Sequence, residues 1–121
     1  MKEDKERHSN HKIEKLRKTF QFQKVYRQGR SVATQSTVLF LKRNDELYNR
    51  LGISISKKMG KSVTRHRLKR LYLEAYRKLK PEILKEGYDF VIIARKGSAN
   101  LTYSEALQDL RKLMLRGKLL K

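Results

Sequence analysis

The spacing of apolar residues changes several times along the chain, and each change predicts a new element. Residues 1–15 are polar and of mixed charge, which is typical of a flexible tail. From Leu16 onward, apolar side chains recur at helical spacing until Gly29, so a short helix is expected over about residues 19–28. The pattern therefore places a single domain over residues 16–121, behind the tail.

Three later stretches are typical of β-strands. Residues 36–43 are rich in β-branched and apolar side chains, and residues 88–95 are apolar enough for a central strand. Residues 50–56 alternate, which predicts a half-buried strand with one small, polar and open face. The apolar face holds Leu51, Ile53 and Ile55, and the open face holds Gly52, Ser54 and Ser56. A further short strand is expected near residues 32–33.

Two more helices are indicated by helical spacing and by terminal signals. The first is expected over about residues 62–79, because Pro81 disfavours its continuation. The last helix begins after Thr102, whose role as N-cap is supported by Glu105 three residues later, and it runs to about Leu115. The predicted order is helix, three strands, helix, strand and helix.

Length and composition narrow the class of protein. The 121 residues fit one domain that can bury a sizeable core. The absence of cysteine excludes a disulfide scaffold, a thiolate zinc site and a cysteine nucleophile, and it fits the reducing cytoplasm. The longest apolar run, residues 90–94, is far shorter than the ~20 residues that span a bilayer. The polar N-terminus also lacks the apolar segment of a signal peptide, so a cytoplasmic location is expected.

Positive charge is concentrated in residues 57–80, which hold ten lysines or arginines and one acid, Glu74. This segment supplies nearly half of the net charge of +19. Such a segment repels itself unless a polyanion lies nearby, and the expected polyanion is a nucleic acid. An anionic membrane is the rival partner, but the apolar stripe of the helix is better explained by packing against the predicted strands.

The sequence shows no set of residues with catalytic spacing. Asp89 has no histidine or second carboxylate at a sequence spacing typical of a catalytic site. Residues 60–62 resemble the end of a phosphate-binding loop but lack its upstream glycine. His66 stands alone among arginines, with nothing to orient it as a general base. The sequence therefore predicts binding, with no catalytic residue, metal site or small-molecule substrate on the protein.

The first candidate binding group lies on the long helix and in the turn before it. Its side chains suit phosphate oxygens: Lys57, Lys58, Lys61, Arg65, His66, Arg67, Lys69, Arg70 and Arg77. A solvated charged face is the alternative. Such a face usually interleaves acids with bases, whereas Glu74 is the only acid here.

The second candidate group consists of aromatic residues: Phe20, Phe22, Tyr26 and Phe40. All of them would suit a core, which is the expectation for Phe20. The alternative places some of them on the wall of a groove where unpaired bases stack. The strand face with Ser54 and Ser56 is too small to cover an apolar helix face, which leaves room for a cleft between the first helix and the sheet.

The basic segment resembles the signature of the bacterial ribonuclease P protein subunit. In that family a strand ends in Ser-x-Ser-Lys-Lys, a glycine turn follows, and the next helix carries Arg-Asn-Arg-x-x-Lys-Arg. The matching residues here are Ser54-Ile55-Ser56-Lys57-Lys58, then Met59-Gly60-Lys61, and then Arg65-His66-Arg67-Leu68-Lys69-Arg70. Shorter matches lie at residues 22–26, 29, 31–33, 91–95 and 101–103, so the resemblance covers about residues 16–115 in order.

The resemblance implies an accessory subunit of a ribonucleoprotein endoribonuclease that removes the 5′ leader of precursor tRNA. The catalytic RNA would carry the hydrolysis with RNA-bound magnesium, and the protein would bind that RNA and the single-stranded leader. The basic helix would face the RNA, and the leader would lie in a cleft between the first helix and the sheet. The implied cleft residues are Phe22, Tyr26 and Phe40, with Ser54 and Ser56 on the strand face beside them.

The implied fold is α+β, ordered αβββαβα around a central mixed sheet, and is similar to a domain of ribosomal and translocase proteins. It contains a left-handed βαβ crossover, against the usual right-handed rule. One position departs from the family, because its central Asn is His66 here, which can still donate or accept a hydrogen bond. The alternative function is a general RNA-binding module, such as a ribosomal protein or an RNA chaperone, and the ordered set of motifs favours the ribonuclease P subunit.

Overall fold

A five-stranded mixed sheet organises the chain in the computed structural model, which describes residues 12–121. The strands are β1 (Glu14–Lys15), β2 (Arg30–Ala33), β3 (Thr37–Arg43), β4 (Arg50–Ser54) and β5 (Tyr88–Ala94). The helices are α2 (Thr19–Gln28), α3 (Ser62–Leu79) and α4 (Tyr103–Arg116), and the 3₁₀ turns are η1 (Lys57–Met59), η2 (Lys80–Glu82) and η3 (Lys96–Ser98). Apart from β1, the helices and strands follow the predicted order.

The order of the strands across the sheet is β1-β4-β5-β3-β2. β3 pairs antiparallel with β2 and β5, whereas β4 pairs parallel with β1 and β5. The parallel β4–β5 pair needs a crossover connection, which α3 supplies. This is the βαβ unit that the resemblance implies to be left-handed. The structure thus confirms an α+β fold around a central mixed sheet.

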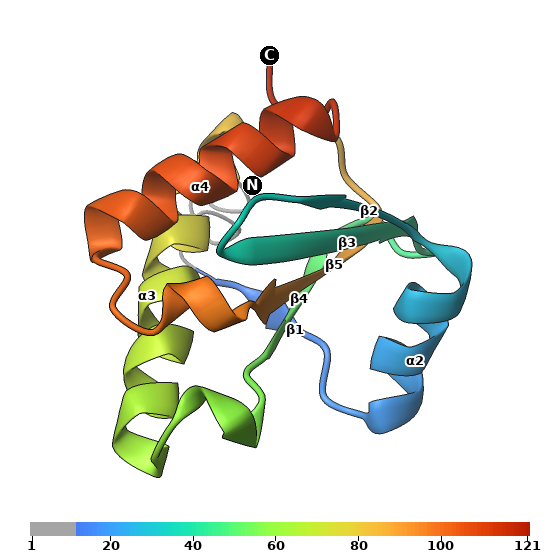
Figure 1. Cartoon of the computed structure of the whole chain (residues 1–121). Coiled ribbons are helices and arrows are strands. Elements are labelled where there is room, and N and C mark those ends of the chain that lie inside the picture. The colour runs from blue at the N-terminus through green and yellow to red at the C-terminus, as the bar shows by residue number, and fades with distance from the viewer. Residues whose placement is uncertain (1–11) are drawn as a thin grey trace.

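Helices cover both faces of the sheet, with α3 and α4 on one face and α2 on the other (Figure 1). Alternation along the strands explains the two layers. In β3, Leu39 and Leu41 are buried in the larger core with α3 and α4, while Phe40 packs in the smaller core with α2. In β4, the predicted apolar face is confirmed, because Leu51 joins the larger core and Ile53 packs against it. The opposite face is less open than predicted, since Gly52 is buried beside α2 and β4 ends at Ser54, before Ser56.

The predicted tail over residues 1–15 ends earlier than expected. Glu14–Lys15 form β1, which pairs in parallel with the start of β4. The backbone N–H of Leu16 donates to the carbonyl of Leu51 at 2.9 Å, and burial of the Leu16 side chain holds the segment against the sheet. A two-residue strand is too short to produce a period in the sequence, which is why the pattern missed it. The rest of the tail prediction falls on residues 1–11, outside the described residues.

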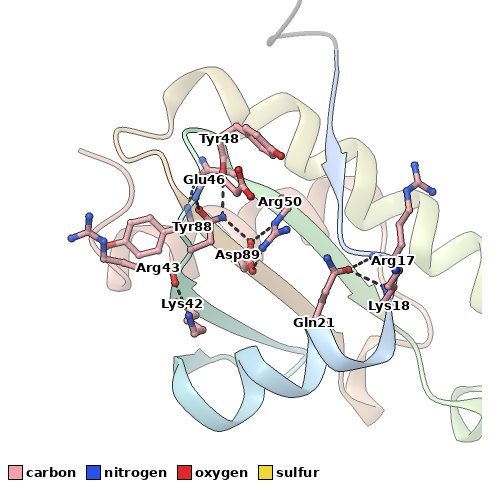
Figure 2. A network of polar contacts seen from close by, with 12 residues as sticks. Arg17, Lys18, Gln21, Lys42, Arg43, Glu46, Tyr48, Arg50, Tyr88 and Asp89 are labelled. Carbon is pink, nitrogen blue, oxygen red and sulfur yellow. Dashed lines mark hydrogen bonds and ion pairs between the residues drawn. The ribbon is translucent and has the colours of Figure 1, made fainter.

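A polar network fixes the start of β4 against the start of β5 (Figure 2). Arg50 donates hydrogen bonds of 2.8 and 2.9 Å to the buried Asp89, and the side-chain amide of Asn44 donates a third at 2.8 Å. The hydrogen bonds with Asp89 raise the pKa of Arg50. Asp89, the isolated acid of the sequence, therefore has a structural role: it holds one end of β4 in register, and a cleft lies at the other end.

Candidate nucleic-acid interface

A cleft of about 570 Å³ lies where the C-terminal end of β4 meets α2 and the N-terminus of α3. One wall comes from α2 and the residue two positions before it, the other from the first turns of α3, and residues 53–55 lie between them. From the sequence, such a cleft was predicted as the alternative to a filled core. The structure confirms that the cleft exists.

The α2 wall is aromatic, and a small residue of β4 makes room for one of its rings. The ring of Phe22 lies over Gly52, where an added Cβ would come within 2.5 Å of a ring carbon. Tyr26 lies one turn further along α2, and its ring packs edge-on against Phe40 with the ring centroids 5.1 Å apart. Phe22 and Tyr26 are both half-buried, so the sheet and β3 support their rings while part of each side chain faces the cleft.

The structure separates the five predicted cleft residues. The cleft is lined by Phe22, Tyr26 and Ser54. Phe40 does not line it, because it lies in the smaller core and supports Tyr26. Ser56 does not line it either, because β4 ends at Ser54 and the exposed Ser56 side chain accepts the backbone N–H of Lys58 to begin η1.

Phe20 is not a core residue, so that expectation from the sequence is wrong. Its side chain is 62% exposed and does not line the cleft. Helix geometry gives the reason, since Phe22 and Val25 turn toward the sheet and a residue two positions before Phe22 points about 200° away from it.

Three residues of the α2 wall were missed by the sequence analysis: Arg17, Thr19 and Gln23. Arg17 is set by a hydrogen-bonded entry to α2, in which Gln21 Oε1 accepts the backbone N–H groups of Arg17 at 2.8 Å and Lys18 at 3.0 Å (Figure 2). Thr19 and Gln23 share the i, i+3, i+4, i+7 spacing of the two aromatic residues, and that spacing could have found them. Arg17 precedes the helix and gives no such signal.

The α3 wall is basic and carries Arg65, His66 and Lys69. Arg65 Nε donates to the carbonyl of Gly60 at 3.2 Å, and the φ of 136° at Gly60 is a backbone conformation that favours glycine. Among residues 12–121, Arg65, Lys69 and Arg17 form no ion pair, and no acidic residue lines the cleft. The cleft is therefore electropositive and attracts anions.

The rest of the predicted basic group lies outside the cleft. Exposed members occupy η1, the turn after it and the outer side of α3: Lys57, Lys58, Lys61, Arg70 and Arg77. The Arg67 guanidinium donates to the carbonyl of Leu101 at 2.7 Å, which ties α3 to the loop before α4. Arg77 pairs with Glu74, so part of its charge is offset. The basic group thus divides between one wall of the cleft and a separate outer surface of α3.

The side chains around the cleft suit binding to a single-stranded nucleic acid. Aromatic rings can stack unpaired bases, and guanidinium and ammonium groups donate to phosphate oxygens. Among residues 12–121, no group of three or more histidines, cysteines or acids could hold a metal ion. Within the same residues, no helix is long and apolar enough to cross a membrane.

Comparison with known proteins gives consistent matches. Residues 11–118 match the Ribonuclease P family. The ribonuclease P protein component of Clostridioides difficile (strain 630) is 43% identical over 101 residues, which cover 84% of this chain and 89% of that protein. The same component from Clostridium botulinum (strain Loch Maree / Type A3) is 47% identical over 94 residues, covering 78% and 85%. The solved RNase P protein of Staphylococcus aureus superposes with a TM-score of 0.82 at 31% identity, covering 91% of this chain and all of that one.

Proposed function

The chain belongs to the Ribonuclease P family as a protein component of that ribonucleoprotein endoribonuclease, and on this premise we propose which RNA each of its surfaces binds. The cleft beside α2 holds the single-stranded 5′ leader of precursor tRNA. The outer surface of α3 binds the catalytic RNA. The protein thereby assists the removal of the leader, while the RNA carries the hydrolysis.

The observation that carries this proposal is the pairing of an aromatic wall with a basic wall across one cleft. Phe22 and Tyr26 offer ring surface to bases, and Arg65 and Lys69 on the facing wall offer charge to the phosphates between those bases. A double-stranded RNA keeps its bases stacked inside the helix, so this combination favours an unpaired strand.

The outer surface of α3 is the second half of the proposal. Arg70 is exposed there, and Lys57, Lys58 and Lys61 continue the charge into the turn before the helix. None of these side chains lines the cleft with the aromatic wall, so they suit the phosphate backbone of a structured RNA. The exposed surface is free for that contact because the opposite side of α3 is buried against the sheet and α4.

In this proposal, the catalytic RNA binds the magnesium ions. Hydrolysis of a phosphodiester at an RNA active site uses metal ions held by the RNA, and the protein contributes affinity for the substrate. The protein would act in the cytoplasm with the catalytic RNA and precursor tRNA as its partners.

A general RNA-binding module was the alternative function, and membership of the family favours the ribonuclease P subunit over it. A general RNA-binding module would also not require the cleft and the outer surface of α3 to bind different RNAs. The two surfaces differ in shape and chemistry, which fits two different RNA ligands.

The first experiment measures cleavage of a 5′-extended precursor tRNA at low magnesium by the bacterial catalytic RNA, with and without this protein. We expect the protein alone to be inactive and the complex to cleave faster than the RNA alone. Binding of the RNA without any gain in cleavage would contradict the proposal. Cleavage by the protein in the absence of RNA would contradict it as well.

A further inference from the structure

A second cleft, of about 520 Å³, lies at the C-terminal end of α2, beyond Tyr26, the last residue of that helix that lines the first cleft. It is open to solvent and is formed where the C-terminal end of α2, the start of β2, the end of β3 and the start of β5 meet. Its charged residues are Arg30, Lys42 and Arg43, and Tyr88 lies beside them. None of these residues belongs to the basic group that the sequence singled out.

The charge in the second cleft is uncompensated. Among residues 12–121, Arg30, Lys42 and Arg43 form no ion pair with an acid. Arg30 donates to the carbonyl of Gly117 at 2.7 Å, and Lys42 Nζ donates to the carbonyl of Arg43 at 2.7 Å. Neutral carbonyls orient the side chains but leave their positive charge for an external anion.

The second cleft also has an aromatic and apolar side. Tyr88 is half-buried, and its ring lies parallel to that of Phe90 with the centroids 6.0 Å apart, so it is held in place. Leu41 lines the same hollow. Figure 2 shows Arg43 and Tyr88 together at one end of the sheet, with Lys42 near them and Arg17 at the far side of the view. A firmly held ring beside cations is suited to an unpaired base and its phosphate.

The surface of α2 connects the two clefts. This helix of ten residues contains no acid and is about 15 Å long. Lys24 and Arg27 are exposed on it, and Gln28 at its last position lines the second cleft. A single strand that leaves the first cleft can therefore follow α2 to the second without meeting a negative side chain of that helix.

We propose that the second cleft binds the part of a long 5′ leader that lies farthest from the cleavage site. This rests on the proposed function of the first cleft. The first cleft adjoins the N-terminus of α3, where the catalytic RNA is expected, so the nucleotides nearest the cleavage site occupy it. The second cleft begins at Gln28, beyond the α2 residues that line the first, so only a strand that extends past the first cleft reaches it.

The experiment measures the affinity of the assembled RNA–protein complex for precursor tRNAs with leaders of about 4 and about 16 nucleotides, which span the site sizes of small single-strand-binding domains. The test variant is Lys42→Gln with Arg43→Gln, which leaves the Arg30 contact with Gly117 intact. The control is Lys96→Gln with Lys112→Gln, which removes the same charge from exposed positions in η3 and α4.

We expect the wild-type complex to bind the long leader more tightly than the short one, and the test variant to lose this gain while binding the short leader normally. Normal binding of the short leader also shows that the variant is folded. For the long leader, the slope of log affinity against log salt should fall by about 0.7 for each phosphate that the variant no longer neutralises. The control should keep both the gain and the slope.

Other outcomes overturn the inference. Equal losses for both leaders would assign the second cleft to the catalytic RNA or to the tRNA body. Equal losses in test and control variants would show a general effect of charge. No gain from the long leader in the wild type, or no change in the test variant, would show that the leader does not reach this cleft. Failure of the proposed function is distinguishable, because wild-type protein would then give no advantage to any leader over mature tRNA.

Discussion

Gly52 and Phe22 show how single residues shape the cleft. A side chain at Gly52 would occupy the space in which the Phe22 ring lies, so glycine lets the ring settle onto β4. Phe22 then leaves room between α2 and α3 instead of filling it. Part of the same ring faces the cleft, so Phe22 is the residue on which the leader-binding proposal is most directly tested.

Phe22→Ala should weaken binding of leader-bearing precursor tRNA by about 1–3 kcal/mol, the range found when a ring that stacks a base is removed. Binding of mature tRNA, which has no leader, should not change. The affinities of both RNAs for the assembled complex provide the measurement. Phe20→Ala is the matched control, because Phe20 lies on the same helix but is 62% exposed and does not line the cleft. An equal loss for both RNAs would mean that Phe22 acts only through the core.

His66 stands where the family has Asn, and it lines the cleft beside Arg65 and Lys69. Both side chains can donate and accept hydrogen bonds, so His66→Asn should leave cleavage nearly unchanged at neutral pH. Single-turnover cleavage of precursor tRNA by the assembled complex measures this. A loss of about tenfold, equivalent to about 1.4 kcal/mol, would instead show a role specific to histidine.

At the scale of elements, α3 combines a buried side with two basic surfaces. Leu68, Tyr72, Ala75, Tyr76 and Leu79 are its buried residues. Thr37 of β3 holds the same helix through its hydroxyl, which lies 2.8 Å from the Tyr72 hydroxyl and donates to Asp109 of α4. The packed inner side holds the backbone of α3 in place, so binding a structured RNA does not have to order this helix.

Arg70→Ala should weaken binding of the catalytic RNA and lower the slope of log affinity against log salt by roughly one unit, because the protein then neutralises one phosphate fewer. Filter binding over a range of salt concentrations measures both quantities. Lys112→Ala, which removes an exposed charge from α4, should leave the slope unchanged. If Arg70→Ala left the slope unchanged too, the outer surface of α3 would not be the surface that binds the RNA.

The buried side of α3 also predicts a dependence on pH. Burial raises the pKa of Tyr76, because the interior disfavours the charged phenolate. A raised pKa in the folded state means that the stabilisation is complete below the unfolded value of about 10 and is lost as pH rises above it. The urea midpoint should therefore fall as pH rises from about 9 to about 11, and Tyr76→Phe should reduce that fall. An identical fall in the variant would exclude Tyr76 as its source.

At the scale of the whole molecule, the dominant property is the net charge of +19. Lys12, Arg50, Arg77 and Arg111 form ion pairs among residues 12–121, and they are a small part of the positive charge there. Repulsion between these cations opposes compaction, and a polyanion that binds the folded state relieves it. Binding of RNA would thus stabilise the folded protein.

Sulfate at millimolar concentrations should therefore raise the melting temperature more than sodium chloride at equal ionic strength. Differential scanning fluorimetry measures this shift. Arg65→Gln combined with Lys69→Gln should reduce the gain, because both residues line the electropositive cleft. A gain of the same size in that variant would point to a general effect of sulfate on apolar burial. No gain in the wild type would show that charge repulsion does not limit its stability.

The sequence by itself determined the order of the main elements, the apolar face of β4 and the basic and aromatic residues that are candidates for binding. These are properties of local spacing: a period of two on a strand, of 3.6 on a helix, and a run of cations interrupted by one acid. The motif around Arg65, Lys69 and Arg70 indicated the family, and the comparisons then showed that the chain belongs to it.

Only the tertiary structure decided how those residues meet. In the structure, Phe22 and Tyr26 lie across a cleft from Arg65. Phe40 and Ser56 do not line that cleft, and Phe20 is exposed. The tertiary structure also paired the two-residue β1 with β4 and brought the ends of α2, β3 and β5 together around a second cleft. These outcomes depend on contacts between segments far apart in the chain, and local periodicity carries no information about such contacts.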